Sequence, residues 1–246
     1  MGRLGWKFYF SLGLIGFSAL LYFIHFVIFQ DARHIFIYLL GDLAFIPLDI
    51  IVITLILHEL LKLREKNTLL KKLNMVIGVF FSETGTTLLK FFSKFDPESQ
   101  KISQSLIISN EFTSHQFANI EKNLKMYEYC IECNSNDLEE IHKFLVGKRG
   151  FLVGLLENPN LLEHESFTDL LWAVFHLTEE LDCRKDLKAI PIKDQEHLIG
   201  DIKRAYSRLI SEWLAYMKHL KINYPYLFSL ALRTNPFDPA ASPIVT

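Results

Sequence analysis

The chain has 246 residues, a net charge of −2 and a hydrophobic content of 50%, with 21 Phe. Its mean hydropathy of +0.19 is too high for a typical soluble protein and too low for one that lies wholly in lipid. We therefore expect a hydrophobic anchor joined to a globular domain. The nearly balanced charge offers no polybasic face, so nucleic acid is not an expected partner. Three cysteines indicate reduced thiols and no disulfide framework.

Two apolar runs near the N-terminus predict membrane spans. Residues 8–29 contain no Asp, Glu, Lys or Arg, and residues 35–61 follow after a link of five residues. At about 1.5 Å per residue, each run is long enough to cross a hydrocarbon layer of about 30 Å. A cleaved signal peptide is disfavoured, because the first run is too long for one and no A-x-A-like site follows it.

The basic residues predict how these spans are oriented. They lie before the first run and after the second, whereas the link holds one Arg against one Asp. Because positive charge is retained on the cytoplasmic side, both termini are expected inside and the link outside. The basic residues are Arg3, Lys7, Lys62, Arg64, Lys66, Lys71 and Lys72.

The second run carries polar features that an anchor does not need. Asp42 and Asp49 are two helical turns apart, so they share a face, and Tyr38 lies one turn earlier on it. An ionised carboxylate at this depth costs about 3 kcal/mol or more. Pro47 removes one backbone donor and leaves a carbonyl without its helical partner.

Two interpretations of these carboxylates remain open. In a homo-oligomer, Asp42 and Asp49 would form stacked acidic rings that line a cation path. Alternatively, Asp42 caps the start of the helix after Gly41, and Asp49 is a protonated or hydrogen-bonded packing group.

Residues 62–97 form an amphipathic neck with apolar residues at helical spacing. The apolar core of this neck, residues 75–81, is too short to span. We expect it to lie at the inner membrane interface, to dip into the membrane or to mediate oligomer contacts. Gly78 and Gly85 would allow close helix approach, and Glu83 is either a solvated helix residue or a functional one.

Residues 98–235 predict a cytoplasmic domain of several helices. One helix starts near Ser135, others cover residues 167–181 and 195–222, and Gly147–Gly150 reads as a turn. Residues 236–246 are expected to form a flexible tail.

Candidate metal ligands lie on the last two long helices. His176 and Glu179 are three residues apart on the first of these. On the second, an eleven-residue repeat keeps five polar residues along one flank. Four of the five could hold a divalent metal inside a helical bundle. Arg208 favours a salt-bridge ladder instead, because a guanidinium between the carboxylates would neutralise them. The five are His197, Asp201, Arg208, Glu212 and His219.

Other motifs give no enzyme chemistry. Cys130 and Cys133 form one C-x-x-C pair without two further zinc ligands at matching spacing. The sequence has no phosphate-binding, dinucleotide-binding, nucleophile-elbow or H-E-x-x-H motif. We therefore predict no cofactor other than the divalent metal considered above, and no catalytic residues.

Three stretches carry a family resemblance: residues 38–47, 74–85 and 224–237. Together they resemble a family of uncharacterised prokaryotic membrane proteins with two N-terminal spans. The resemblance implies a bacterial or archaeal inner membrane and supports this architecture, but it implies no activity. The third stretch is aromatic, and we expect it either to dock on the neck or membrane surface or to pack in the core.

The expected fold is all-α, with a two-span transmembrane helical hairpin and a cytoplasmic helical-bundle domain. The expected partners are the lipid bilayer, further copies of the chain and a cytoplasmic protein. The first functional hypothesis is a homo-oligomeric ion-conducting pore gated by the cytoplasmic domain. The second is a membrane-anchored scaffold or sensor whose helical domain binds a protein partner or a metal.

Overall fold

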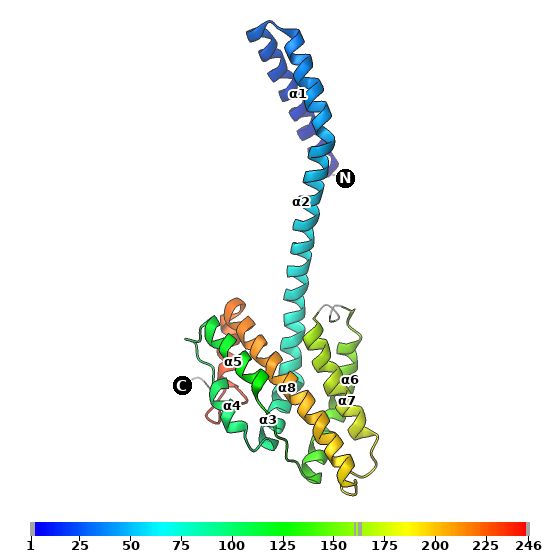
Figure 1. The fold of residues 1–246 in the computed structure, drawn as a ribbon, viewed down its shortest axis with the longest axis vertical. Helices are drawn as coiled ribbons and strands as arrows, with labels where there is room; N and C mark the ends of the chain where they lie inside the picture. The colour runs from blue at the N-terminus through cyan, green and yellow to red at the C-terminus, as the bar shows by residue number, and fades with distance from the viewer. Residues whose placement is uncertain (1–2, 160, 162–163, 245–246) are drawn as a thin grey trace. The chain divides into compact units, whose positions relative to one another are not determined.

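The computed structural model describes residues 3–159, 161 and 164–244, and the side chains of residues 3–4 and 66–72 are left out of the description. The side chains of Arg3, Lys66, Lys71 and Lys72, used above to orient the spans, thus lie outside the described residues. All regular structure in the described part is helical, which confirms the all-α class (Figure 1). The chain divides into two compact units, Met1–Glu65 and Lys66–Thr246.

The first unit is an antiparallel pair of helices. Helix α1 covers Arg3–Phe29, and α2 begins at Ala32. Gln30 adopts a left-handed φ of 52°, the conformation that commonly ends a helix. Asp31 then caps α2, because its Oδ1 accepts from the backbone N–H groups of Arg33 and His34 at 2.9 and 3.2 Å. The suggested cap at Asp42 is wrong, since that residue lies inside α2.

Helix α2 covers Ala32–Phe80 and contains Pro47, so its residues are divided between the two units. Three helical segments in the described part are long and apolar enough to cross a membrane, judged by length and composition alone. They are Gly5–Phe29, Ala32–Glu65 and Leu73–Phe95. The first two hold no buried residue in their most apolar window, whereas 44% of the third is buried within the protein.

The third apolar segment is the centre of the second unit's core. It comprises the end of α2, a π-helix η1 at Phe81–Gly85 and α3 at Thr86–Phe95. Most of its apolar side chains recur at three- and four-residue spacing and are buried, whereas Met75 and Val79 are exposed. This burial differs from the expected interfacial neck. The apolar helical segment, Leu73–Phe95, is longer than the core expected at residues 75–81. The buried residues include Leu73, Ile77, Phe80, Phe81, Leu88, Leu89, Phe92 and Phe95.

In the described part of the second unit, six further helices surround this core: α4 (Ser99–Leu106), α5 (Ser114–Met126), α6 (Ser135–Leu156), α7 (Glu165–Asp182), α8 (Ile192–Asn223) and α9 (Pro225–Arg233). Helix α7 packs against both α6 and α8. Helix α6 starts where predicted, capped by Asn134, but it continues through the expected turn at Gly147–Gly150. Leu145 and Leu152 on either side of these glycines are fully buried, so packing keeps the helix continuous.

The start of the expected flexible tail is packed against the second unit. Asn235 is buried, and its Nδ2 donates to the Leu106 carbonyl at 2.8 Å. Phe237 is also buried, edge-on to Trp213 with ring centroids 5.0 Å apart. Two specific contacts therefore hold the first residues of this segment, while residues 245–246 lie outside the described part.

Candidate metal centre

The candidate centre lies beside the interface between α7 and α8. Leu170, Val174 and Leu177 of α7 are fully buried, as are Leu198 and Ile202 of α8. These apolar stripes fix how the two helices face each other. The polar side chains that flank the stripes are thereby brought together from both helices.

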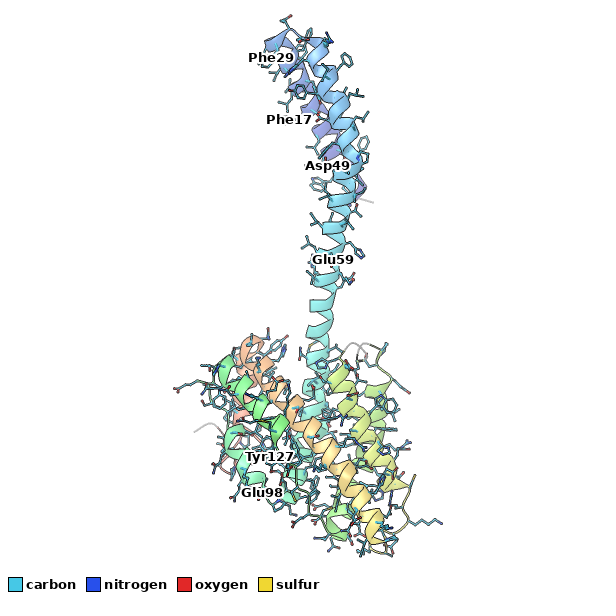
Figure 2. The ribbon with its side chains drawn as sticks, in the orientation of Figure 1. Phe17, Phe29, Asp49, Glu59, Glu98 and Tyr127 are labelled. Atoms are coloured by element: carbon cyan, nitrogen blue, oxygen red, sulfur yellow. The ribbon has the colours of Figure 1, made fainter. Side chains whose placement is uncertain are left out.

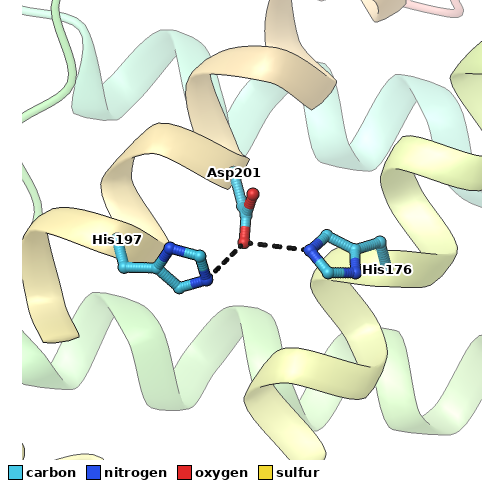
Figure 3. Close-up of side chains that lie close together, drawn as sticks. All are labelled: His176, His197 and Asp201. Carbon is cyan, nitrogen blue, oxygen red and sulfur yellow. Dashed lines mark ion pairs between the residues drawn. The ribbon is translucent and has the colours of Figure 1, made fainter.

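Three predicted residues converge here. Nε2 of His176 and Nε2 of His197 each lie 3.4 Å from the same oxygen, Oδ2 of Asp201 (Figure 3). Asp201 is only 2% exposed, and this oxygen has no hydrogen-bond donor among the described residues. Its other oxygen, Oδ1, accepts from Nη1 of Arg204 at 2.7 Å. Half of the carboxylate is therefore satisfied, and the other half faces two imidazoles.

Glu180 contributes a second carboxylate close to both imidazoles, and it was not among the predicted metal ligands. Its Oε1 lies 3.8 Å from Nε2 of His176, and its Oε2 lies 3.6 Å from Nε2 of His197. Arg184 donates to Glu180 Oε2 at 2.8 Å and forms a two-point pair with Asp194 at 2.7 and 2.6 Å. The hydrogen bond from Arg184 lowers the pKa of Glu180, so this carboxylate stays ionised at neutral pH.

The donor set fits a divalent transition metal. The three ligand atoms lie within 4.8 Å of one another. Metal–ligand bonds of about 2.0–2.2 Å at tetrahedral angles place neighbouring ligand atoms about 3.4 Å apart. Two imidazole nitrogens and one carboxylate oxygen are typical zinc donors and leave a fourth position for water or for Glu180.

A salt-bridge cluster without metal is the competing interpretation. Charge-assisted hydrogen bonds from an imidazolium to a carboxylate are typically about 2.7–2.9 Å. Both separations of 3.4 Å are longer than that, and neither makes a hydrogen bond that would satisfy Oδ2. The spacing is therefore closer to that of two ligands on one ion than to a direct pair.

The other three metal candidates lie elsewhere. Glu179 pairs with Nε of Arg149 at 2.9 Å. Glu212 is buried and lines a separate pocket that also contains Arg208. The guanidinium of Arg208 reaches toward Asp169 of α7, with Nη2 4.0 Å from Oδ2. Of the expected ladder along α8, the pair His197–Asp201 is present at 3.4 Å, whereas Arg208 pairs with a residue of α7.

His219, the last candidate, belongs to a different cavity at the opposite end of α8. Of the neck residues, Gly78 faces the hydroxyl of Tyr216, and Glu83 pairs with Nζ of Lys148 at 2.9 Å. Gly85 is packed so closely that a Cβ there would lie 2.6 Å from a ring carbon of Phe81.

The polar residues of the first unit divide into two groups. Asp42 and Tyr38 line a pocket of about 550 Å³ within the helix pair, together with His25 and His34. Asp49 is not among its lining residues, nor is Pro47, which lies within α2. The interpretation of Asp42 and Asp49 as stacked rings in an oligomer stays a prediction.

Comparison with known proteins identifies the family. Residues 69–233 match "Uncharacterized protein MJ1433, C-terminal helical domain", and residues 2–61 match "MJ1433, N-terminal helical domain". The chain is 46% identical over 225 residues to "Uncharacterized protein MJ1433" of Methanocaldococcus jannaschii, covering 92% of this chain and 90% of that protein. No solved structure matches the chain. With two matched segments and this identity along nearly the full length, the chain belongs to the MJ1433 family of helical proteins.

Proposed function

We propose that this protein is a membrane-anchored metal-binding protein whose helical unit holds one divalent transition-metal ion at His176, His197 and Asp201. One observation carries the proposal. A buried carboxylate oxygen without a hydrogen-bond donor lies 3.4 Å from two imidazole nitrogens supplied by different helices. A buried carboxylate oxygen without a hydrogen bond is costly, and a bound cation removes that cost.

The surrounding charges favour a cation. Glu180, Asp194 and Asp201 contribute three carboxylates, and Arg184 and Arg204 contribute two guanidinium groups. The net charge of this cluster is −1 when both imidazoles are neutral. Arg204 donates a hydrogen bond to one oxygen of Asp201 and leaves the other oxygen for the metal. Carboxylates that bind metals are commonly oriented by such a hydrogen bond from a residue that does not itself touch the metal.

The imidazoles provide the adjustable part of the site. Their side chains are 46% and 53% exposed, so an ion can enter from solvent without opening the core. Because imidazole binds metal only in its neutral form, metal affinity falls as the pH is lowered. The ion would link α7, through His176, to the first turns of α8. Its binding would therefore stabilise the packing of these two helices against each other.

Metal content of the purified full-length protein tests this function. We expect about one zinc ion per chain after loading and dialysis, measured by elemental mass spectrometry. His176→Ala and His197→Ala are each expected to weaken binding by about 100-fold or more, measured by competition with a chromophoric chelator. A wild-type stoichiometry near zero removes the proposal.

His142→Ala is the matched control for this experiment. Its Nε2 lies 3.3 Å from one oxygen of Asp182, a comparable His–carboxylate pair outside the centre. It has no second imidazole, so we expect metal binding to be unchanged. Equal losses in this variant and in His197→Ala would show that the effect is not specific to the centre.

Helix α1 and residues 32–65 of α2 are the proposed anchor, in a prokaryotic inner membrane with both termini in the cytoplasm. Their side chains are apolar and exposed, and Lys7, Lys62 and Arg64 support this orientation. The exposed thiols Cys130 and Cys183 are native reporters for the second unit. An impermeant maleimide should label them only after permeabilisation, whereas Asp31→Cys should be labelled in intact cells; the reverse pattern contradicts this orientation.

A homo-oligomeric ion-conducting pore gated by the helical unit is a second candidate, favoured by the polar pocket around Asp42. Six polar side chains line this pocket between apolar helices, an arrangement that often marks an ion path. Cation flux into liposomes should fall in Asp42→Asn and in Asp49→Asn if both carboxylates serve the path. Flux that stays at background in wild type and in both variants excludes the pore.

A further inference from the structure

The second unit contains a pocket that the metal proposal does not use. It has a volume of about 440 Å³, within the range of about 300–1,000 Å³ typical of small-molecule sites. The end of α2 and η1 form one wall, α8 forms the second, and α9 with the residues after it forms the third. Residues of the aromatic 224–237 stretch and residues of the segment predicted as the neck thus line opposite walls of this pocket, within the second unit.

The lining is mostly apolar and carries no formal charge. None of the described residues that line the pocket is Asp, Glu, Lys or Arg. Trp213, Tyr216 and Tyr224 contribute aromatic surface. Burial raises the pKa of Tyr216, so its hydroxyl remains protonated at neutral pH. Phosphates, carboxylates and other ions would lose their hydration here without gaining a countercharge, so the occupant must be uncharged.

His219 lines the pocket and carries a ring N–H group that has no acceptor among the described residues. Nδ2 of Asn223 lies 3.1 Å from the His219 carbonyl and 3.2 Å from its Nδ1. The carbonyl accepts only, so the atom facing it is the amide nitrogen, and Nδ1 of His219 must also accept. The ring proton therefore lies on Nε2, which is buried and has no acceptor among the described residues.

The rim of the pocket indicates where the occupant comes from. Five residues that line the pocket are exposed and apolar, in two groups on α2 and α9. A pocket with an apolar rim is entered from an apolar phase more readily than from water. The rim residues are Met75, Val79, Tyr226, Leu227 and Leu230.

We infer that this pocket binds an uncharged, lipid-soluble molecule that carries a carbonyl or hydroxyl oxygen. The apolar part lies against the aromatic lining, and the oxygen accepts from Nε2–H of His219 after a small side-chain adjustment, because that atom is covered. The π-helix η1 contributes Phe81 and Ser82 to the wall, and π-helical turns are frequent at functional sites. The inference does not rest on metal binding.

Photolabelling of the full-length protein in nanodiscs tests the inference. The probe is a diazirine-bearing long-chain alcohol, and the labelled peptides are mapped by mass spectrometry. We expect label on residues 74–86 and 213–236 to be saturable by unlabelled alcohol. Label on residues 5–29 should not be saturable, because it reports contact with bulk lipid. Label at the pocket that is equally non-saturable overturns the inference.

Two variants separate filling of the pocket from recognition of the oxygen. Ala231→Trp places a large ring in the lining and should reduce saturable labelling at least fivefold. Ile222→Trp, an exposed position of α8 outside the lining, is the matched control and should leave labelling unchanged. If the control variant loses label to the same extent as Ala231→Trp, the pocket is not the site.

His219→Phe keeps an aromatic ring but removes the donor. We expect it to abolish the preference for the alcohol probe over the matching hydrocarbon probe while the hydrocarbon still labels the pocket. A preserved alcohol preference in this variant contradicts the role of Nε2. Helix content measured by circular dichroism should be unchanged in both pocket variants, so that loss of label is not loss of fold.

Discussion

The same residue types are buried in one unit of this protein and exposed in the other. In the helix pair, Phe17 is 59% exposed and Leu40 is 70% exposed, and Figure 2 shows the side chain of Phe17 on α1. In the second unit, Phe92 and Leu88 are fully buried. The second unit therefore builds its own core, whereas the helix pair leaves its apolar side chains exposed, as expected of candidate membrane spans.

The segment Leu73–Phe95 shows why hydropathy alone does not separate these cases. It is long and apolar enough to cross a membrane, yet many of its apolar side chains are buried in the core, where its rings contact rings of α6, α7 and α8. What differs is the presence of partners whose apolar stripes match its own. Helices that pack against such partners form a core. Helices without them can bury their apolar side chains only in lipid or against another chain.

Truncating one phenylalanine in each unit gives the largest expected contrast. Phe92→Ala removes a fully buried ring that contacts Tyr206 edge-on, and should lower the free energy of unfolding by about 3–5 kcal/mol. Phe17→Ala removes an exposed ring and should change the unfolding of the second unit by less than about 0.5 kcal/mol. Urea denaturation of the full-length protein, monitored by hydrogen exchange in the second unit, measures the free energy of unfolding of both variants. Equal effects would mean that the two units share one core.

Glycine substitutions sharpen the role of close packing. In Gly85→Ala the new Cβ would lie 2.6 Å from Phe81 and 2.9 Å from Phe80, so rings must shift and unfolding should become easier by about 1–3 kcal/mol. Gly147→Ala is the matched control in the middle of α6, where nothing lies within 4 Å. It should stabilise by about 0.5–1 kcal/mol, because alanine is the better helix former. Thermal denaturation compares the two, and stabilisation by Gly85→Ala would contradict the packing argument.

The smallest expected effect concerns the pH dependence of stability at Glu180, beside the candidate metal centre. Arg184 lowers the pKa of Glu180 below its ordinary value of 4.5. Because a lowered carboxyl pKa stabilises the folded state only while the group is ionised, this contribution is complete above about pH 4.5 and is lost as the pH falls through the lowered pKa. The urea midpoint of metal-free wild type should therefore drop more steeply below pH 4.5 than that of Arg184→Gln. Parallel pH profiles would show that Arg184 does not stabilise Glu180.

Much of the local structure follows from the sequence. The apolar runs at residues 8–29 and 35–61 fall within α1 and α2, and the predicted helices at 167–181 and 195–222 fall within α7 and α8. Periodicity and length are sufficient for these assignments, because they depend only on neighbours along the chain. The prediction of a turn at Gly147–Gly150 was wrong, and α6 continues through these residues. Burial of Leu145 and Leu152 outweighs the low helix propensity of glycine.

The candidate metal centre was also predictable only in part: contacts within one helix follow from the sequence, and contacts between helices do not. His197 and Asp201 are one helical turn apart, so the sequence alone places them on one side of α8. Glu180 follows His176 by four residues, and the same rule could have found it, although only the three-residue spacing to Glu179 was considered. That α7 brings His176 and Glu180 to the pair on α8 was decided by packing, because helical periodicity fixes neighbours within a helix and leaves open which faces of two helices meet.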